Sequence, residues 1–277
     1  MNKRAIRERI EWFFDLVTPT RIVKAEVTYL APNSRLQGKK IIITGGNRGL
    51  GFSMARKFTQ EGAQVLIAGR DVVSLKQSAN EIGCDFLSLD VNDVSSFSSF
   101  MEKSDKLLGG VNVLVNNAGV SLHEGDISNV TENSFNIQLN TNLRGGYFLS
   151  KEFLKVYERD KRQKGSILFM SSERGRYVDD IPYGLTKAAI NSLVEGLSIA
   201  RREANIRINA LAPGITATKM TGHNIDNLNA PTYSTGRVYL PEEVAEIACF
   251  LISDAAGCVS GQTIYCDNGY SVNSYKK

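Results

Sequence analysis

The sequence predicts an α/β fold in which one doubly wound parallel sheet of about seven strands carries helices on both faces. Ile41, Ile42 and Ile43 are typical of a strand buried on both faces, and they lead into a glycine-rich turn. From residue 39 onward, strand and helix patterns alternate, which implies parallel strands joined by right-handed helical crossovers. A chain of 277 residues with 42% hydrophobic content can bury one large core, so we expect a single domain with a short addition.

The expected elements follow one another along the chain as this fold requires. Strand patterns cover residues 40–44, 64–69, 85–89, 111–116, 166–170, 207–211 and 262–266. Helical patterns cover residues 49–61, 72–82, 94–108, about 141–161 and 241–253. Residues 219–237 hold Gly222, Pro231 and Gly236 among many Asn and Thr, and we interpret them as a mobile lid, with a plain surface loop as the alternative.

Composition and charge exclude several classes of protein. The four cysteines form no C-x-x-C pair and only two histidines are present, so neither a disulfide framework nor a metal site is predicted. No apolar run approaches the roughly 20 residues that span a bilayer, and we expect a soluble, cytoplasmic protein. Residues 1–40 contain nine Lys or Arg against four Asp or Glu, so the net charge of +4 belongs to this segment and gives no indication of a nucleic-acid-binding body.

Residues 1–37 read as a basic amphipathic extension that precedes a catalytic domain of residues 38–277. Five apolar side chains fall on one helical face, before Thr18-Pro19 ends the pattern: Ile6, Ile10, Phe13, Phe14 and Val17. The segment lacks the apolar core and cleavage site of a secretory signal. We expect this helix to dock on the body or on another subunit; a helix resting on an anionic membrane surface is the less favoured alternative.

The turn after the first strand has the form of a phosphate-binding turn. Gly45, Gly49 and Gly51 leave no Cβ in the way of a ligand, and the helix that follows begins with free amides and the positive end of its dipole. This arrangement suits a pyrophosphate. A tight strand-to-helix connection without a ligand is the alternative interpretation.

The end of the second strand indicates which dinucleotide is bound. An acid near this point would grip the adenosine ribose, yet Gly69 occupies its place and Arg70 follows. Arg48, inside the glycine turn, can converge on the same ligand group. Two guanidinium groups suit a 2′-phosphate, so NADP(H) is favoured over NAD(H), which stays open; two solvated surface arginines are the alternative.

Two further strand ends carry polar residues at the edge where ligands bind. Asp90-Val91 follows the third strand, where an acid could accept the adenine amino group. The fourth strand closes with Asn116-Asn117-Ala118-Gly119. Consecutive asparagines can be mere turn chemistry, but at the carboxyl edge of a parallel sheet we expect them to line the cofactor.

Four polar side chains form a candidate catalytic group. Tyr183 and Lys187 are four residues apart, so on a helix the phenol and the ammonium can point into the same cleft. Ser172 ends the fifth strand and Asn142 stands near the start of the long helix. Ser171 is the rival of Ser172, but alternation sends the two side chains to opposite faces, so only one can serve.

Acid–base work by a tyrosine near neutral pH requires its pKa to fall from about 10 by roughly three units. A unit charge about 4 Å away contributes roughly 4 kcal/mol at an effective dielectric near 20, which is enough for a shift of that size. We therefore expect Lys187 to lower the pKa of Tyr183.

Together these motifs resemble the classical short-chain dehydrogenase/reductase family over roughly residues 38–272. The matching residues are, in chain order, Thr44-Gly45-x-x-x-Gly49-x-Gly51, Asn116-Asn117-Ala118-Gly119, Ser172, Tyr183-x-x-x-Lys187 and Asn209-x-x-x-Pro213-Gly214. The resemblance implies a single Rossmann-like domain with strand order 3-2-1-4-5-6-7, commonly assembled as a homotetramer or a dimer.

The resemblance also implies roles for individual residues. Tyr183 would protonate the carbonyl oxygen, Ser172 would hold that oxygen, and Lys187 would bind the nicotinamide ribose. Asn142 would position a water that leads protons to the lysine. The cofactor-binding residues expected are Thr44, Gly45, Asn47, Arg48, Gly49, Leu50, Gly51, Arg70, Asp90, Val91, Asn117, Ala118, Gly119, Tyr183, Lys187, Pro213, Gly214, Ile215 and Thr218.

The expected function is NADPH-dependent reduction of a ketone to a secondary alcohol, similar to that of 3-oxoacyl-(acyl carrier protein) reductases, on a free or carrier-bound substrate. Gln163 and Ala204 stand where those enzymes often present arginines to the acidic carrier. The basic residues next to these positions, which could substitute, are Arg162, Lys164, Arg201 and Arg202. The alternatives are a sugar, polyol or steroid-type dehydrogenase, and a non-catalytic NADP(H)-binding regulatory protein.

Overall fold

The computed structural model describes residues 34–233 and 235–272. The amphipathic helix expected in residues 1–18 lies outside the described residues. Packing of the body begins slightly upstream of residue 38, because Leu36 is fully buried in the core. Arg35 next to it forms ion pairs with Glu61 (2.6 Å) and Glu246 (3.0 Å), which lie on two different helices or their ends.

Seven parallel strands form one sheet in the order β3-β2-β1-β4-β5-β6-β7, which confirms the predicted topology. The strands are β1 (Lys40–Thr44), β2 (Gln64–Gly69), β3 (Asp85–Ser88), β4 (Val113–Asn116), β5 (Gly165–Met170), β6 (Ile206–Pro213) and β7 (Thr263–Cys266). The central strands β1, β4 and β5 are almost wholly buried, as their unbroken apolar runs predict.

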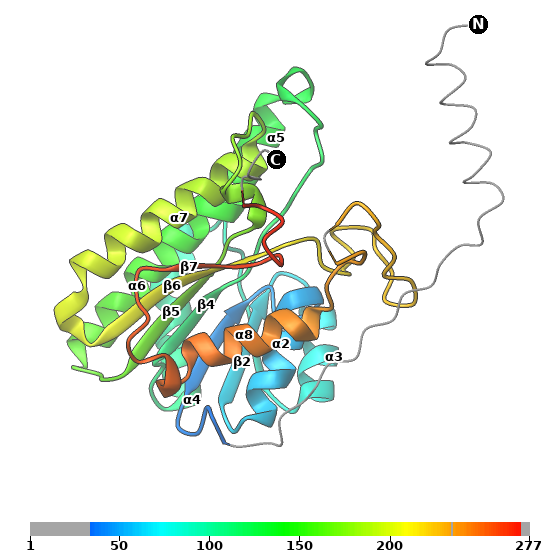
Figure 1. The fold of residues 1–277 in the computed structure, drawn as a ribbon. Helices are drawn as coiled ribbons and strands as arrows, with labels where there is room; N and C mark the ends of the chain where they lie inside the picture. Colours follow the sequence, from blue (N-terminus) through cyan, green and yellow to red (C-terminus); the bar gives the residue numbers. More distant parts are fainter. Residues whose placement is uncertain (1–33, 234, 273–277) are drawn as a thin grey trace, which may run out of the picture.

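Helices cover both faces of the sheet (Figure 1). One layer holds α2 (Gly49–Gln60), α3 (Val72–Ile82) and α8 (Pro241–Ile252). The other holds α4 (Phe97–Leu108), α6 (Gly145–Arg159) and α7 (Pro182–Ala200). Alternate residues of β1 serve the two layers, since Ile41 and Ile43 pack in the first core and Ile42 in the second.

The long helix expected at about residues 141–161 differs from the prediction at its start. A separate helix, α5 (Glu132–Leu139), precedes it and is capped by reciprocal hydrogen bonds between Thr131 and Ser134. A π-helical turn (Asn140–Arg144) then joins α5 to α6. Gln138 is the one buried residue of α5, so its sequence lacks the apolar stripe that reveals most helices.

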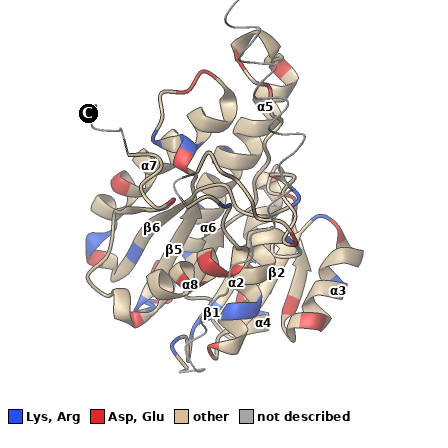
Figure 2. Ribbon diagram, turned by 45° about the vertical axis from the view of Figure 1, so that its right-hand side comes forward, with Lys and Arg blue, Asp and Glu red and all other residues tan. Residues whose placement is uncertain are grey.

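Charges of both signs are interspersed over the described surface (Figure 2). Short 3-10 turns join several elements, including η4 (Glu173–Gly175) directly after β5 and η5 (Arg202–Ala204) after α7. Among the residues that the structure describes, no helix is both long and apolar enough to cross a membrane.

Candidate active site

The glycine turn after β1 can be built only with glycines. Gly45 and Gly49 have positive φ angles of 65° and 53°, which side chains with a Cβ rarely adopt. A Cβ on Gly51 would overlap the Gly45 carbonyl oxygen, so the absence of this atom lets α2 pack tightly against the turn. Leu50 between them packs against the core.

This turn fits the diphosphate of a dinucleotide. Arg48 is the N-cap residue of α2 and its side chain does not cap the helix, so the first amides of α2 have no side-chain acceptor. Thr218 lies over the turn, because its methyl carbon would be 3.5 Å from a Cβ on Gly49. Thr218 thus lies beside the turn that we expect to hold the diphosphate.

Residues of the Asn-Asn-Ala-Gly motif form hydrogen bonds to the start of the glycine turn. Thr44 Oγ1 accepts hydrogen bonds from the backbone amides of Asn117 and Ala118, both at 3.0 Å. Asn117 Nδ2 donates to the carbonyl oxygens of Thr44 (2.9 Å) and Gly45 (3.1 Å). The side chains of Thr44 and Asn117 thus shape the turn through the backbone, and Gly119 follows at the edge of the catalytic group.

The predicted adenosine side of the site lies where the glycine turn meets β2. A Cβ on Gly69 would be 3.5 Å from Asn47 Oδ1, and Asn47 Nδ2 donates to Ser74 Oγ (2.9 Å) at the start of α3. Arg48 and Arg70, the next residue in each segment, are exposed at this junction.

Asp90 and Val91 follow β3 on the same edge of the sheet. Asp90 Oδ1 accepts from the Asn92 amide (2.9 Å), which leaves its second oxygen available to a ligand. A Cβ on Gly145 would overlap the Val91 carbonyl oxygen, so α6 approaches this loop closely. The packing keeps both residues at the carboxyl edge of the sheet.

Ser172, Tyr183 and Lys187 come together at the carboxyl end of β5. The hydroxyl of Ser172 lies close enough to the Tyr183 phenol to lower its pKa. Lys187 Nζ lies 5.4 Å from the centroid of the Tyr183 ring and donates to the Met170 carbonyl oxygen (2.8 Å). Burial of the ammonium lowers the pKa of Lys187 to about 8.

The pKa of Tyr183 departs from the sequence-based expectation. Burial of the phenol raises this pKa above its ordinary value, and the Ser172 hydrogen bond lowers it by less. Without a cofactor, the pKa of Tyr183 is therefore raised, whereas we expected Lys187 to lower it. Burial disfavours both the phenolate of Tyr183 and the ammonium of Lys187. At neutral pH the phenol carries its proton.

Asn142 reaches the group from the π-helical turn. Its Oδ1 accepts from the Val120 amide (2.8 Å) and its Nδ2 donates to the Val120 carbonyl oxygen (2.9 Å). A Cβ on Gly119 would lie 3.4 Å from Asn142 Oδ1 and 3.8 Å from Lys187 Nζ, so the two side chains flank this glycine. All four expected catalytic residues thus occupy one region.

The two adjacent serines separate as alternation predicts. Ser171 Oγ donates to Asn191 Oδ1 (2.7 Å) on α7 and is used in packing. Ser172 Oγ accepts from the Arg174 amide (3.2 Å) and meets the phenol of Tyr183. The geometry therefore selects Ser172 as the serine of the catalytic group.

The segment after β6 runs past the glycine turn, which Thr218 approaches, and then enters the predicted lid. Pro213 ends β6, and Ile215 packs with a small apolar cluster within and next to the lid: Ala217, Leu228, Ala230 and Val238. Arg237 ties this segment to α8 through an ion pair with Glu243 (2.6 Å).

Sequence reasoning missed three residues that face Gly214: Glu173, Tyr239 and Asp267. A Cβ on Gly214 would lie 3.1 Å from Glu173 Oε2, 2.9 Å from Tyr239 Cε2 and 3.2 Å from Asp267 Cβ. Burial, together with the charge of Asp267, raises the pKa of Glu173 to about 7. An acid directly after the catalytic serine was the available signal in the sequence.

The fold and the site define an NAD(P)-dependent oxidoreductase. A family model described as enoyl-(acyl carrier protein) reductase matches residues 45–271. The chain is 32% identical over 248 residues to the 3-oxoacyl-[acyl-carrier-protein] reductase FabG of Chlamydia muridarum, covering 86% of this chain and 99% of that protein. It is 31% identical over 253 residues to the galactitol 2-dehydrogenase of Agrobacterium fabrum (85% and 98%) and 31% identical over 255 residues to oxidoreductase UcpA of Salmonella typhimurium (85% and 95%). The chain therefore belongs to the short-chain dehydrogenase/reductase family.

Proposed function

We propose that this protein is an NADPH-dependent reductase that converts a ketone into a secondary alcohol. The observation that carries the proposal is the placement of the Tyr183 phenol beside the Ser172 hydroxyl, with the Lys187 ammonium 5.4 Å from the centre of its ring. A protonated phenol is ready to donate to a carbonyl oxygen, whereas oxidation of an alcohol requires the phenolate. The proposed reduction uses the phenol in this protonated form.

In the proposed mechanism, bound NADPH supplies the hydride. Tyr183 donates its phenol proton to the carbonyl oxygen of the substrate, and the Ser172 hydroxyl holds that oxygen by a hydrogen bond. Lys187, fixed by the Met170 carbonyl oxygen, stabilises the phenolate that remains until a proton returns. Asn142 acts by clamping both backbone groups of Val120, which keeps the loop after β4 beside the lysine.

The preference for NADPH is proposed from Arg48 and Arg70. Both guanidinium groups are exposed where the glycine turn meets the end of β2. Neither makes a hydrogen bond or an ion pair within residues 34–233 and 235–272, so both are available to a 2′-phosphate. No carboxylate stands at Gly69 to bind the ribose of NAD(H) or to repel that phosphate.

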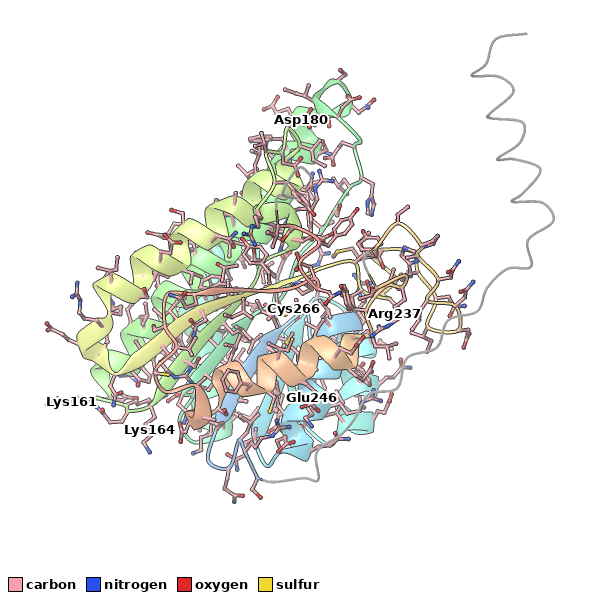
Figure 3. All side chains as sticks on the ribbon, viewed as in Figure 1. Lys161, Lys164, Asp180, Arg237, Glu246 and Cys266 are labelled. Carbon is pink, nitrogen blue, oxygen red and sulfur yellow. The ribbon has the colours of Figure 1, made fainter. Side chains whose placement is uncertain are left out.

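We propose a free small-molecule ketone as substrate, in preference to a carrier-bound one. The basic residues around Gln163 and Ala204 are largely engaged: Arg162 pairs with Asp105 and Asp160, Arg201 with Glu158, and Lys164 more loosely with Asp254. Gln163 itself accepts from Asn205 Nδ2 (2.6 Å). Figure 3 shows Lys161 and Lys164 at the end of the molecule opposite to Asp180. An acidic carrier would compete with these internal partners.

We also propose that the protein forms a homo-oligomer through the outer faces of α5, α6 and α7. These helices expose large apolar side chains, namely Phe135, Ile137, Tyr147, Leu185 and Ile199. Burial of such side chains between subunits would remove them from water. Sedimentation or light scattering of the purified full chain would show a mass above that of the monomer, and a strictly monomeric protein would refute this assembly.

The function is tested by a panel of acetoacetyl thioesters, ketoses and ketosteroids offered with NADPH or with NADH. We expect consumption of NADPH with at least one ketone class, and slower consumption of NADH. A protein that binds NADPH and consumes it with none of these ketones would refute the reductase proposal and leave a nucleotide-binding regulatory role.

A further inference from the structure

Glu173 is a buried acid that the proposed hydride-transfer chemistry does not use. It follows Ser172 directly, opens the turn η4 and is only 5% exposed. In the part of the chain that the structure describes, neither carboxyl oxygen makes a hydrogen bond, and Oε2 is sealed from solvent. Buried polar groups in folded proteins are almost always paired, so an unpaired carboxyl beside a catalytic serine requires an explanation.

The neighbouring cation does not neutralise this carboxyl. The Arg174 guanidinium is turned to Asp179, with Nε and Nη2 donating at 2.7 Å and 2.8 Å. Asp267, the acid that faces Glu173, is itself satisfied by the backbone amides of Gly269 (3.0 Å) and Ser271 (2.9 Å). Within the described residues, Glu173 therefore has neither a cation paired with it nor a hydrogen-bond partner for its carboxyl group.

Gly214 and several tyrosines form a wall around the Glu173 carboxyl. Gly214 lies on one side of the carboxyl, and Tyr239 is next to that glycine. The buried Tyr239 hydroxyl lies near Thr235 but makes no well-formed hydrogen bond. Tyr177 and Tyr233 are also close enough for the charge of Glu173 to raise their pKa values. The Tyr233 ring stacks on Tyr270, with centroids 4.5 Å apart. Residues from the lid and from the segment after β7 thus close around the acid.

This wall is close to the reacting atoms. Glu173 is the residue after Ser172 in the chain, and its negative charge raises the pKa of the Tyr183 phenol. Gly214 belongs to the segment after β6 that the family resemblance assigns to the nicotinamide. A substrate whose carbonyl oxygen rests on Ser172 and Tyr183 would therefore present its neighbouring carbon atoms to Glu173.

We propose that Glu173 determines substrate specificity by hydrogen-bonding a hydroxyl group on a hydroxylated ketone, such as a ketose, close to the reacting carbonyl. The inference rests on the proposed reductase function and specifies its substrate class. A buried carboxyl group can accept a hydrogen bond from a hydroxyl group in either protonation state, and in its neutral form it can also donate one. The alkyl chain of a 3-oxoacyl thioester offers no such partner and would leave the buried acid unpaired.

The test compares ketones that differ only in one hydroxyl group. The pairs are 4-hydroxy-2-butanone with 2-butanone and a four-carbon ketose with its deoxy analogue, each assayed with NADPH. For the wild type we expect kcat/KM to be at least about tenfold higher for the hydroxylated member of each pair. Glu173→Leu should lose this preference or reverse it, and Glu173→Gln, which keeps two hydrogen-bonding atoms, should retain most of it.

Controls separate specificity from folding and from the reductase function itself. Glu203→Leu removes an exposed acid on η5 and should leave the ratio unchanged. NADPH binding by each variant reports an intact fold. An unchanged ratio in a folded Glu173→Leu protein overturns the proposal, as does a wild type that prefers a charged aminoketone over the hydroxyketone. Failure of the wild type to reduce any ketone refutes the proposed function instead.

Discussion

The two walls around Tyr183 differ in how their polar groups are satisfied. On the catalytic wall, the Ser172 hydroxyl, the Lys187 ammonium and the Asn142 amide all have partners within the protein. On the second wall, which Glu173 forms with Gly214 and Tyr239, the Glu173 carboxyl has none. The satisfied groups hold a fixed geometry for chemistry that the family shares, whereas the unsatisfied acid marks the side on which this chain meets its own substrate.

The largest effect among the following variants is expected for Ser172, and its neighbour provides the control. Ser172→Ala removes the donor that holds the carbonyl oxygen, so kcat/KM should fall about 10²–10³-fold. Ser171→Ala removes hydrogen bonds to the Asn191 side chain and to the backbone carbonyl of Lys187 and no contact with the phenol, so kcat/KM should stay within about threefold while stability falls by about 1 kcal/mol. Steady-state kinetics and urea unfolding measure the two effects. Equal kinetic losses in both variants would show that the serines had been assigned wrongly.

A smaller effect is expected at the nucleotide end, far from both walls. Arg70→Asp replaces a donor to the 2′-phosphate by a like charge, so KM for NADPH should rise about 10–100-fold while KM for NADH changes little. Lys76→Asp, on the exposed side of α3, makes the same charge change and should leave both values near those of the wild type. The NADP assignment fails if Arg70→Asp leaves the ratio of the two KM values unchanged.

A further prediction tests the second wall through stability instead of kinetics. The folded-state pKa of Glu173 is about 7 against 4.5 for an exposed carboxyl, so between these values the folded protein binds more protons than the unfolded chain. Stability is therefore fully present below about pH 4.5 and is lost as pH rises through about 7, by roughly 3 kcal/mol in total.

Glu173→Gln removes this dependence because its amide does not titrate. Relative to the wild type, the variant should gain stability at about pH 8 and not at about pH 4.5, as urea unfolding at the two pH values would show. The exposed Glu203→Gln serves as the control and should show no such change with pH. A Glu173→Gln variant that differs from the wild type by the same amount at both pH values would contradict the burial of a neutral acid.

Sequence patterns were sufficient for the sheet and for the catalytic wall. Unbroken apolar strands that alternate with helices predicted the parallel sheet, and the family resemblance implied its strand order. The Tyr183-x-x-x-Lys187 spacing predicted that the phenol and the ammonium lie close together. Helix α5 escaped prediction because a capping pair, Thr131 and Ser134, marks its start while no apolar stripe marks its length.

Burial from distant segments explains what else the sequence could not provide. The pKa of Tyr183 depends on desolvation, which no local motif reports, so its direction was predicted wrongly. Glu173 acquires its meaning only when the segment after β6, the lid and the end of β7 close around it. These contacts join residues that are 41 to 94 positions apart in the sequence, such as Gly214, Tyr239 and Asp267.

The most direct test of the account is the activity of Tyr183→Phe with NADPH and the best ketone of the panel. The variant keeps the ring and its packing and lacks only the phenol proton, so turnover should fall by about 10³-fold or more while the dissociation constant for NADPH stays within about twofold of the wild-type value. Turnover within about tenfold of the wild type would contradict the assignment of Tyr183 as the proton donor.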